Sequence, residues 1–353
     1  MSVFAVFEGQ KRTTTSGDDA QQNGSFSLYE LERQIRTAGA GMIQGNRYGL
    51  WGCPITAFSA STQRLPMTAA IISAPFNAWP TITRAVPILI ADGGSDSAGH
   101  ALPDVIGVVS GNPHGRVFKA AVTGTPDSAT VVLSNSFGIF KNDYLLGILT
   151  NGSCALNLTT ADPTVTNTIT LSAPDGPSTG LVGTLGSYVF DMGPNPVLSL
   201  FGVDPVGHTL GEYDLLQRSL NGNPAAIIPI ADGIVSMKAL YGIHDGSLSP
   251  GEDPDVIDKW VQPNGANWSI AALNASTASA FAAMNQIKAI RVVVVAQSKL
   301  PERAKDYIGS STMVLFPDLA PALRYTITTQ TQFRYKVYDT TIPIRNALIT
   351  KYF

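Results

Sequence analysis

The sequence has few charged residues and no excess of basic ones. Of its 353 residues, 23 are Lys or Arg and 26 are Asp or Glu, so charged side chains make up 14% and the net charge is −3. Soluble globular chains usually carry about 25% charged residues. Without a basic excess or a Lys/Arg-rich run, no nucleic-acid partner is expected. The hydrophobic content of 44% excludes intrinsic disorder.

Long apolar runs and targeting segments are also missing. No run approaches the ~20 apolar residues that span a bilayer, and the longest ones, residues 86–91 and 292–296, are typical of buried strands. The start, residues 3–7, is apolar but too short for a signal peptide and has no basic residues before it. Low charge with many small polar residues favours an exported β-rich protein, so its export signal is expected to lie outside this chain.

Recognisable catalytic motifs are absent as well. The four histidines do not pair at metal-ligand spacing, and the sequence has no nucleophile elbow, P-loop or dinucleotide-binding glycine motif. We therefore predict that the protein is not an enzyme and has no cofactor.

One acidic segment between residues 241 and 260 is a candidate calcium site. Calcium takes about 6–8 oxygen ligands, which closely spaced carboxylates on a turning loop supply. The alternative is a solvated acidic turn, favoured because the spacing is not that of an EF-hand and two prolines stiffen the segment. The candidate ligands are Asp245, Asp253, Asp255 and Asp258.

Helix is expected mainly at the N-terminus, over residues 3–38. Leu28, Leu31 and Ile35 recur on one helix face. Ser27 and Glu30 have the spacing of a capping box. The poor helix formers at 13–19 leave open one long helix or two shorter ones.

The helix should end at Gly39 and Gly41, and the remainder of the chain reads as strands. The 33 glycines and 23 prolines exclude a helical bundle, and short apolar runs bounded by Gly, Pro, Asn and Asp predict strands. A second helix is predicted over residues 270–286. The predicted strands are 69–73, 86–91, 105–109, 116–122, 130–133, 144–150, 155–159, 168–171, 186–191, 197–202, 209–216, 234–243, 289–297, 325–329 and 334–342.

This order indicates an α+β fold with antiparallel sheets, because helices do not alternate with strands. We expect an N-terminal helix over residues 1–41 and a β-rich globular head over residues 42–353, with two sheets as one arrangement of that head.

The two cysteines, Cys53 and Cys154, are 101 positions apart. From the residues alone, two interpretations stay open. They are either unpaired buried thiols or one disulfide formed in an oxidising compartment.

Five stretches, in order along the chain, resemble PilW, a minor pilin family of the type IV pilus. Residues 22–39 end in L-E-R-Q-I-R-T-A-G, similar to the end of the family's helix, and residues 49–54 (GLWGCP) resemble the cysteine segment that follows it. Residues 142–156 resemble the strand with the second cysteine. Residues 229–243 (PIADGIVSMKALYGI) and 334–346 (RYKVYDTTIPIRN) are similar to two further family stretches.

The resemblance implies a pilin-like fold in which the N-terminal helix packs on antiparallel sheets. It implies a membrane helix ahead of this chain, with residues 3–7 as its last turn, and a Cys53–Cys154 disulfide formed after export. Helix packing and assembly are then the expected roles of Phe26, Leu28, Leu31 and Ile35, although packing in the protein's own core is the simpler role for the last three.

The implied function is that of a non-catalytic minor pilin in the tip or priming complex that initiates pilus assembly. Its partners would be other minor pilins, the major pilin and the inner membrane. It would reside in the inner membrane and periplasm before assembly and at the cell surface afterwards. A type II secretion pseudopilin and a secreted β-rich adhesin or ligand-binding module remain alternatives. A glycan-binding module would need an exposed aromatic platform, for which the candidates are Trp51, Trp79, Trp260 and Trp268.

Overall fold

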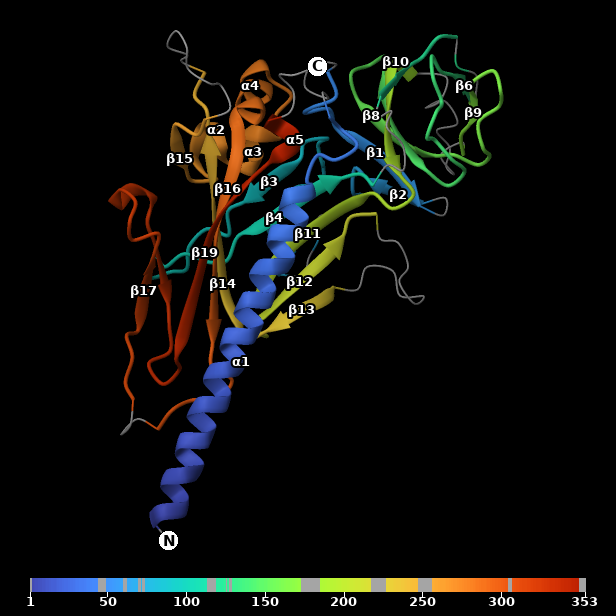
Figure 1. Cartoon of the computed structure of the whole chain (residues 1–353). Helices are drawn as coiled ribbons and strands as arrows, with labels where there is room; N and C mark the ends of the chain where they lie inside the picture. Colours follow the sequence, from blue (N-terminus) through green and yellow to red (C-terminus); the bar gives the residue numbers. More distant parts are fainter. Residues whose placement is uncertain are drawn as a thin grey trace.

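The N-terminal helix is the longest element of the protein. The computed structural model describes residues 2–43, 49–59, 62–68, 71, 74–112, 119–124, 126, 129–172, 185–216, 227–246, 256–303 and 307–348. Helix α1 runs without a break from Ser2–Thr37, so the alternative of two segments is wrong. In Figure 1 its first half projects beyond the sheets, while its second half lies across them.

Helix α1 ends where the sequence predicts, but the capping box predicted at Ser27 and Glu30 does not form its start. Gly39 and Gly41 have φ of 80° and 77°, a backbone conformation that glycine adopts without strain and that commonly terminates helices. Ser27 lies well inside the helix, where its Oγ donates to the Asn23 carbonyl at 2.7 Å. The capping-box assignment is therefore wrong, because the helix begins two dozen residues earlier.

Three larger sheets and two smaller ones make up the described part of the head, where the sequence suggested two. The six-stranded sheet is antiparallel except for the pair β1–β8. Its strands, in spatial order, are β2 (Thr62–Leu65), β1 (Ile55–Ser59), β8 (Cys154–Leu158), β7 (Tyr144–Leu149), β10 (Leu185–Gly193) and β5 (Lys119–Ala121).

The other two large sheets are antiparallel throughout. The five-stranded sheet has the order β13 (Ile228–Asp232), β12 (Thr209–Asp214), β11 (Val197–Asp204), β4 (Val105–Ser110), β3 (Ile88–Ala91). The four-stranded sheet has the order β15 (Lys259–Val261), β14 (Ile234–Ile243), β16 (Ile287–Gln297), β19 (Tyr335–Pro343). Two-stranded sheets join β17 (Thr312–Leu315) to β18 (Tyr325–Thr328) and β6 (Thr130–Val132) to β9 (Thr168–Thr170).

The second predicted helix is interrupted. Residues 270–286 form α3 (Ile270–Leu273) and α4 (Ala278–Gln286), preceded by α2 (Gly265–Trp268). Thr277 is extended and its side chain accepts a hydrogen bond from the Ala280 amide, so it caps a new helix. The remaining short helices are η1 (Phe76–Ala78), η3 (Pro321–Leu323) and α5 (Arg345–Leu348).

The predicted strands are largely present, with shifted ends. The sequence missed β1, β2, β13, β15 and β17, and the expected strand at 69–73 falls almost wholly outside the described residues.

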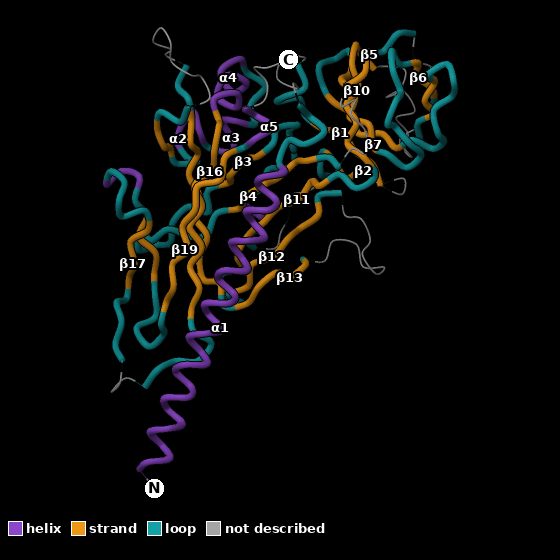
Figure 2. The backbone as a smooth tube through the Cα atoms, in the orientation of Figure 1, coloured by secondary structure: helices purple, strands orange, loops and turns teal. Residues whose placement is uncertain are grey.

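The core has a main body and two satellites. Helix α1 lies against strands of both the five-stranded and the four-stranded sheet, as Figure 2 shows. A satellite cluster on the outer side of the four-stranded sheet includes Leu240, Val293 and Tyr325, and the β17–β18 hairpin covers it. The other satellite lies between the six-stranded sheet and the β6–β9 pair.

Candidate functional site

One face of α1 is buried against the head, and small residues form part of it. Ala20, Gly24, Ser27, Leu31 and Ile35 are buried and recur every three or four residues, as one helix face requires. Together they form the buried face of α1. Its N-terminal members, Ala20, Gly24 and Ser27, are small, so the four-stranded sheet can approach the helix closely.

Gly24 allows the closest approach. A Cβ built there would lie 2.1 Å from Cε2 of Tyr338 on β19. Tyr338 Oη donates to the Gln21 carbonyl at 2.8 Å. At the end of the helix, Asn346 Nδ2 donates to the Ala38 carbonyl at 2.8 Å. The C-terminal segment therefore holds the N-terminal helix at two points, which nothing in the spacing of the sequence indicates.

The four expected helix-packing residues divide into two groups. Leu31 and Ile35 are fully buried, and Leu28 is half-buried against the same core. Phe26 is 46% exposed, and Tyr29, three positions further, is 60% exposed. Both lie on the side of the helix opposite the buried face, since each residue advances about 100° around the axis. We call Phe26 and Tyr29 the outer aromatic pair.

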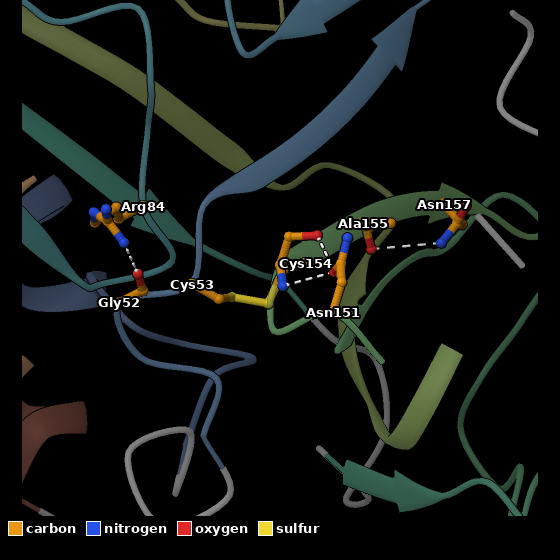
Figure 3. Close-up of a disulfide and its surroundings, with 8 residues drawn as sticks. Gly52, Cys53, Arg84, Asn151, Cys154, Ala155 and Asn157 are labelled. Atoms are coloured by element: carbon orange, nitrogen blue, oxygen red, sulfur yellow. Dashed lines mark hydrogen bonds between the residues drawn. A yellow bond between two sulfur atoms is a disulfide. The ribbon is translucent and has the colours of Figure 1, made fainter. Parts of the chain in front are cut away.

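The two cysteines form a disulfide, as the resemblance implies. Cys53 lies just before β1, Cys154 opens β8, and their Cα atoms are 5.7 Å apart (Figure 3). Both cysteines are buried. Because Ile55 on β1 pairs in parallel with Cys154, the bridge fastens the start of one strand to the start of its neighbour.

A buried arginine lies beside the disulfide segment. Arg84 is among the largest fully buried side chains and donates to the Gly52 carbonyl, to Asn274 Oδ1 at 2.9 Å and to Ser276 Oγ at 3.0 Å. Burial lowers the pKa of its guanidinium. Its hydrogen bonds tie the segment before β1 to the turn between α3 and α4.

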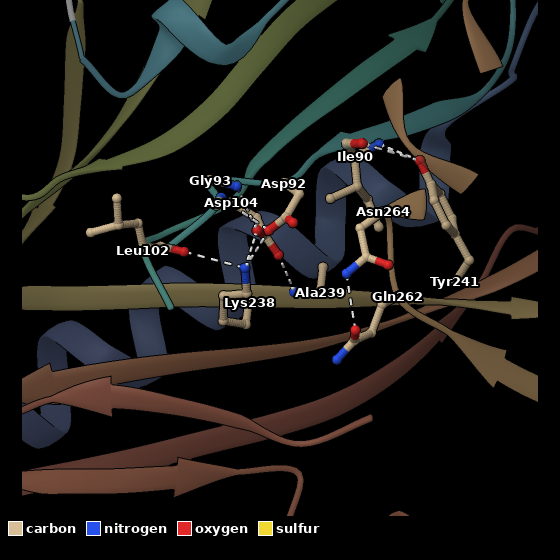
Figure 4. A network of polar contacts seen from close by, with 11 residues as sticks. Ile90, Asp92, Gly93, Leu102, Asp104, Lys238, Ala239, Tyr241, Gln262 and Asn264 are labelled. Carbon is tan, nitrogen blue, oxygen red and sulfur yellow. Dashed lines mark hydrogen bonds and ion pairs between the residues drawn. The ribbon is translucent and has the colours of Figure 1, made fainter. Parts of the chain in front are cut away.

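A cluster of charged groups is buried between β14 and the segment that joins β3 to β4. Lys238 Nζ donates to Asp92 Oδ1 at 2.9 Å, to the Leu102 carbonyl at 3.2 Å and to Asp104 Oδ1 (Figure 4). Lys238 and Asp104 are fully buried, whereas the Asp92 side chain is 24% exposed. We call Lys238, Asp92 and Asp104 the buried charge cluster.

Backbone amides fix the Asp104 carboxylate. Oδ2 accepts from the Ala239 amide at 2.9 Å, and Oδ1 accepts from the Gly93 amide at 3.1 Å. Burial raises the pKa of Asp104 to about 6, against the opposing charge of Lys238. Burial also works to raise the pKa of Asp92, but Lys238 and the Gly94 amide bring it below its usual value.

The acidic turn is only partly described. Asp258 Oδ2 accepts from the Asp245 amide at 2.9 Å and lies 2.8 Å from His244 Nδ1, while Lys259 Nζ is 3.5 Å from Asp245. Asp253 and Asp255 lie outside the described residues. In the described part, no three His, Cys, Asp or Glu side chains gather as a metal site would require.

The tryptophans do not form an exposed aromatic platform. Trp51 and Trp79 are buried, and Trp260 and Trp268 are half-buried. None of the helices that the structure describes has the length and apolar composition needed to cross a bilayer.

The architecture is that of the expected class: α+β, with an N-terminal helix packed on antiparallel sheets. Residues 206–346 match the family model of PilW, the Type IV Pilus-assembly protein W, which confirms the resemblance over the part of the chain that holds the stretches 229–243 and 334–346. The match supports a component of the type IV pilus.

Comparison with solved structures finds a type IV-like pilin from Thermus thermophilus. It shares 9% sequence identity with this chain, and the match covers 59% of this chain and 86% of that pilin at a TM-score of 0.23. No curated protein matches the chain.

Proposed function

We propose that this protein is a minor pilin that acts, without catalysis, in the tip or priming complex that initiates type IV pilus assembly. The observation that carries the proposal is the PilW match over residues 206–346. It is supported by α1, whose described side chains pack on the head along one face. The partners would be other minor pilins and the major pilin. The protein would reside in the inner membrane and periplasm before assembly and at the cell surface afterwards.

The outer aromatic pair is the feature of α1 best suited to contact a neighbouring pilin helix. Large aromatic side chains are enriched among the residues that dominate binding energy at interfaces. Phe26 and Tyr29 lie one helical turn apart on the side that faces away from the head. A partner helix that packed along this side would bury both rings without disturbing the buried face.

The test is co-purification of the full chain with each candidate minor pilin, comparing the double variant Phe26→Ser/Tyr29→Ser with the unchanged protein. We expect a defined complex whose affinity falls at least about tenfold in the variant, corresponding to about 1.4 kcal/mol. The matched control is Phe137→Ser/Phe140→Ser, which removes two exposed phenylalanines, 71% and 50% exposed, from a loop next to the six-stranded sheet.

The control pair should leave the affinity unchanged. The proposal is wrong if no complex forms with any minor pilin and pili assemble normally in cells that lack the gene. A complex with type II secretion pseudopilins instead would assign the protein to that system.

A further inference from the structure

The buried charge cluster brings a fully buried amine and a fully buried carboxyl group into contact. Lys238 comes from β14, whereas Asp104 immediately precedes β4, 134 positions away in sequence. Lys238 Nζ contacts Asp104 Oδ1, and both side chains have no exposed surface. The β17–β18 hairpin supplies Tyr325, which is buried and whose ring centroid lies 4.2 Å from Nζ.

We propose that Lys238 and Asp104 are joined by an intramolecular isopeptide bond between Nζ and Cγ, and that Asp92 relays protons during its formation. The product is an amide that crosslinks the four-stranded sheet to the five-stranded sheet. The proposal is independent of the role in pilus assembly.

The reaction is a condensation that needs no oxidant and no cofactor. An ammonium and a carboxylate together become one amide and one molecule of water. The lone pair of Nζ forms the new bond to Cγ, the bond from Cγ to Oδ1 breaks, and Oδ1 leaves as water with two of the three protons that the ammonium carried. The third proton stays on the amide nitrogen.

Asp92 is placed to move those protons. Its Oδ1 accepts a hydrogen bond at 2.9 Å from Nζ, which also contacts Asp104 Oδ1. It can therefore take a proton from the nitrogen and pass it to the departing oxygen, ending unchanged, as a general acid–base group does. Since the Asp92 side chain is 24% exposed, it can also exchange protons with solvent.

The backbone supplies the stabilisation that the tetrahedral intermediate needs. Negative charge develops on Oδ2, which the Ala239 amide already contacts at 2.9 Å. Such a preset donor in a dry site is a strong source of rate enhancement. The Gly93 amide, 3.1 Å from Oδ1, holds the leaving oxygen in contact with Nζ.

The surroundings favour the neutral form of the Asp104 carboxyl group. A low dielectric disfavours a buried charge, and burial raises the pKa of Asp104 to about 6. Desolvation also leaves an amine as a better nucleophile than it is in water.

The test is the intact mass of the purified full chain after denaturation and reduction of the disulfide. A crosslinked chain is lighter than its sequence by the mass of one water molecule. A digest should contain one branched peptide that joins the segments of Lys238 and Asp104. Lys259 and Asp245, an exposed pair 3.5 Å apart, should not lose a second water molecule and serve as the internal control.

Asp104→Ala should restore the full sequence mass, and Asp92→Asn should slow the loss of water at least tenfold. If the unchanged, folded protein has the full sequence mass and separate peptides, the cluster is an ordinary ion pair and the proposal is wrong. If Asp92→Asn crosslinks as fast as the unchanged protein, the relay role is wrong. The mass of the unchanged protein shows whether the isopeptide bond is present, even where a variant does not fold.

Discussion

At the scale of the residue, two glycines of α1 differ in the space around them. Gly24 meets Tyr338, whereas a Cβ at Gly17 would have no atom within 4 Å. Replacing a helical glycine by alanine gains up to about 1 kcal/mol in helix propensity, and crowding a packed contact costs about 1–3 kcal/mol. We predict that Gly17→Ala raises the free energy of unfolding and that Gly24→Ala lowers it, as measured by chemical denaturation.

A second change checks the cause. Adding Tyr338→Ala to Gly24→Ala removes the ring, so the two substitutions should cost less together than the sum of their separate effects. If Gly24→Ala is as stable as Gly17→Ala, the tyrosine moves aside freely and the close contact does not hold the helix.

Arg291 on β16 sets the titration of a carboxylate next to it. It donates from Nη1 to Asp318 Oδ2 at 2.7 Å and from Nη2 to Asp339 Oδ2 at 2.6 Å. The hydrogen bond from Arg291 lowers the pKa of Asp318 below its ordinary value of 3.8. A lowered carboxyl pKa contributes stability that is present above the unfolded value and lost as pH falls through the folded one. This contribution therefore disappears below about pH 4.

We predict that Arg291→Gln raises the pKa of Asp318 towards 3.8, as followed by NMR of the side-chain carboxyl carbon. Asp96 is the control, because the His100 and Ala98 backbone amides, rather than Arg291, lower its pKa. An unchanged Asp318 midpoint in the variant would show that another group sets its pKa.

At the scale of the element, the cap of α4 determines where the helix starts. Thr277 accepts from the Ala280 amide at 3.2 Å. Loss of an N-cap side chain costs about 1 kcal/mol. We predict that Thr277→Ala lowers the free energy of unfolding by about that amount, while Thr277→Ser, which keeps the hydroxyl, leaves it nearly unchanged. Equal losses in thermal denaturation would point to the methyl group rather than the cap.

Elements with a strong pattern could be predicted from the sequence, and those defined by pairing could not. Strand β16 has the run VVVV and is buried on both faces, so its apolar run identifies it. Strand β15 has three residues and β2 reads TQRL, so neither shows a pattern until its neighbour is known. The sequence predicts one helix over residues 270–286, because the apolar periodicity continues past Thr277. Only the extended backbone of Thr277 shows that this residue caps a second helix.

The same limit applies to the candidate sites. The spacing of Leu31 and Ile35 predicts a buried helix face, and both are fully buried. Lys238 lies in a strand that was predicted correctly, but its carboxylate partners are 134 and 146 positions away. No local pattern connects residues at such separations, so the buried charge cluster becomes visible only in three dimensions.

At the scale of the whole molecule, the disulfide closes a loop with a sequence separation of 101. Removing a crosslink of this length frees the unfolded chain, with a cost of up to about 4.7 kcal/mol in the chain-entropy model. We predict that Cys53→Ser/Cys154→Ser lowers the free energy of unfolding by about 2–5 kcal/mol, as measured by urea denaturation. A reductant should destabilise the unchanged protein to a similar extent and leave the variant unaffected; a variant as stable as the oxidised protein would contradict the prediction.

The hydrogen bond from Tyr338 to Gln21 also has a consequence for biosynthesis. The two residues are 317 positions apart, and the second hydrogen bond that holds the helix, from Asn346 to Ala38, joins residues 308 positions apart. Chains emerge from the ribosome N-terminus first, so α1 is made long before β19 and α5 exist. Its buried face therefore has no complete partner until Tyr338 and Asn346 have been synthesised. A helix that is translated early is thus covered late.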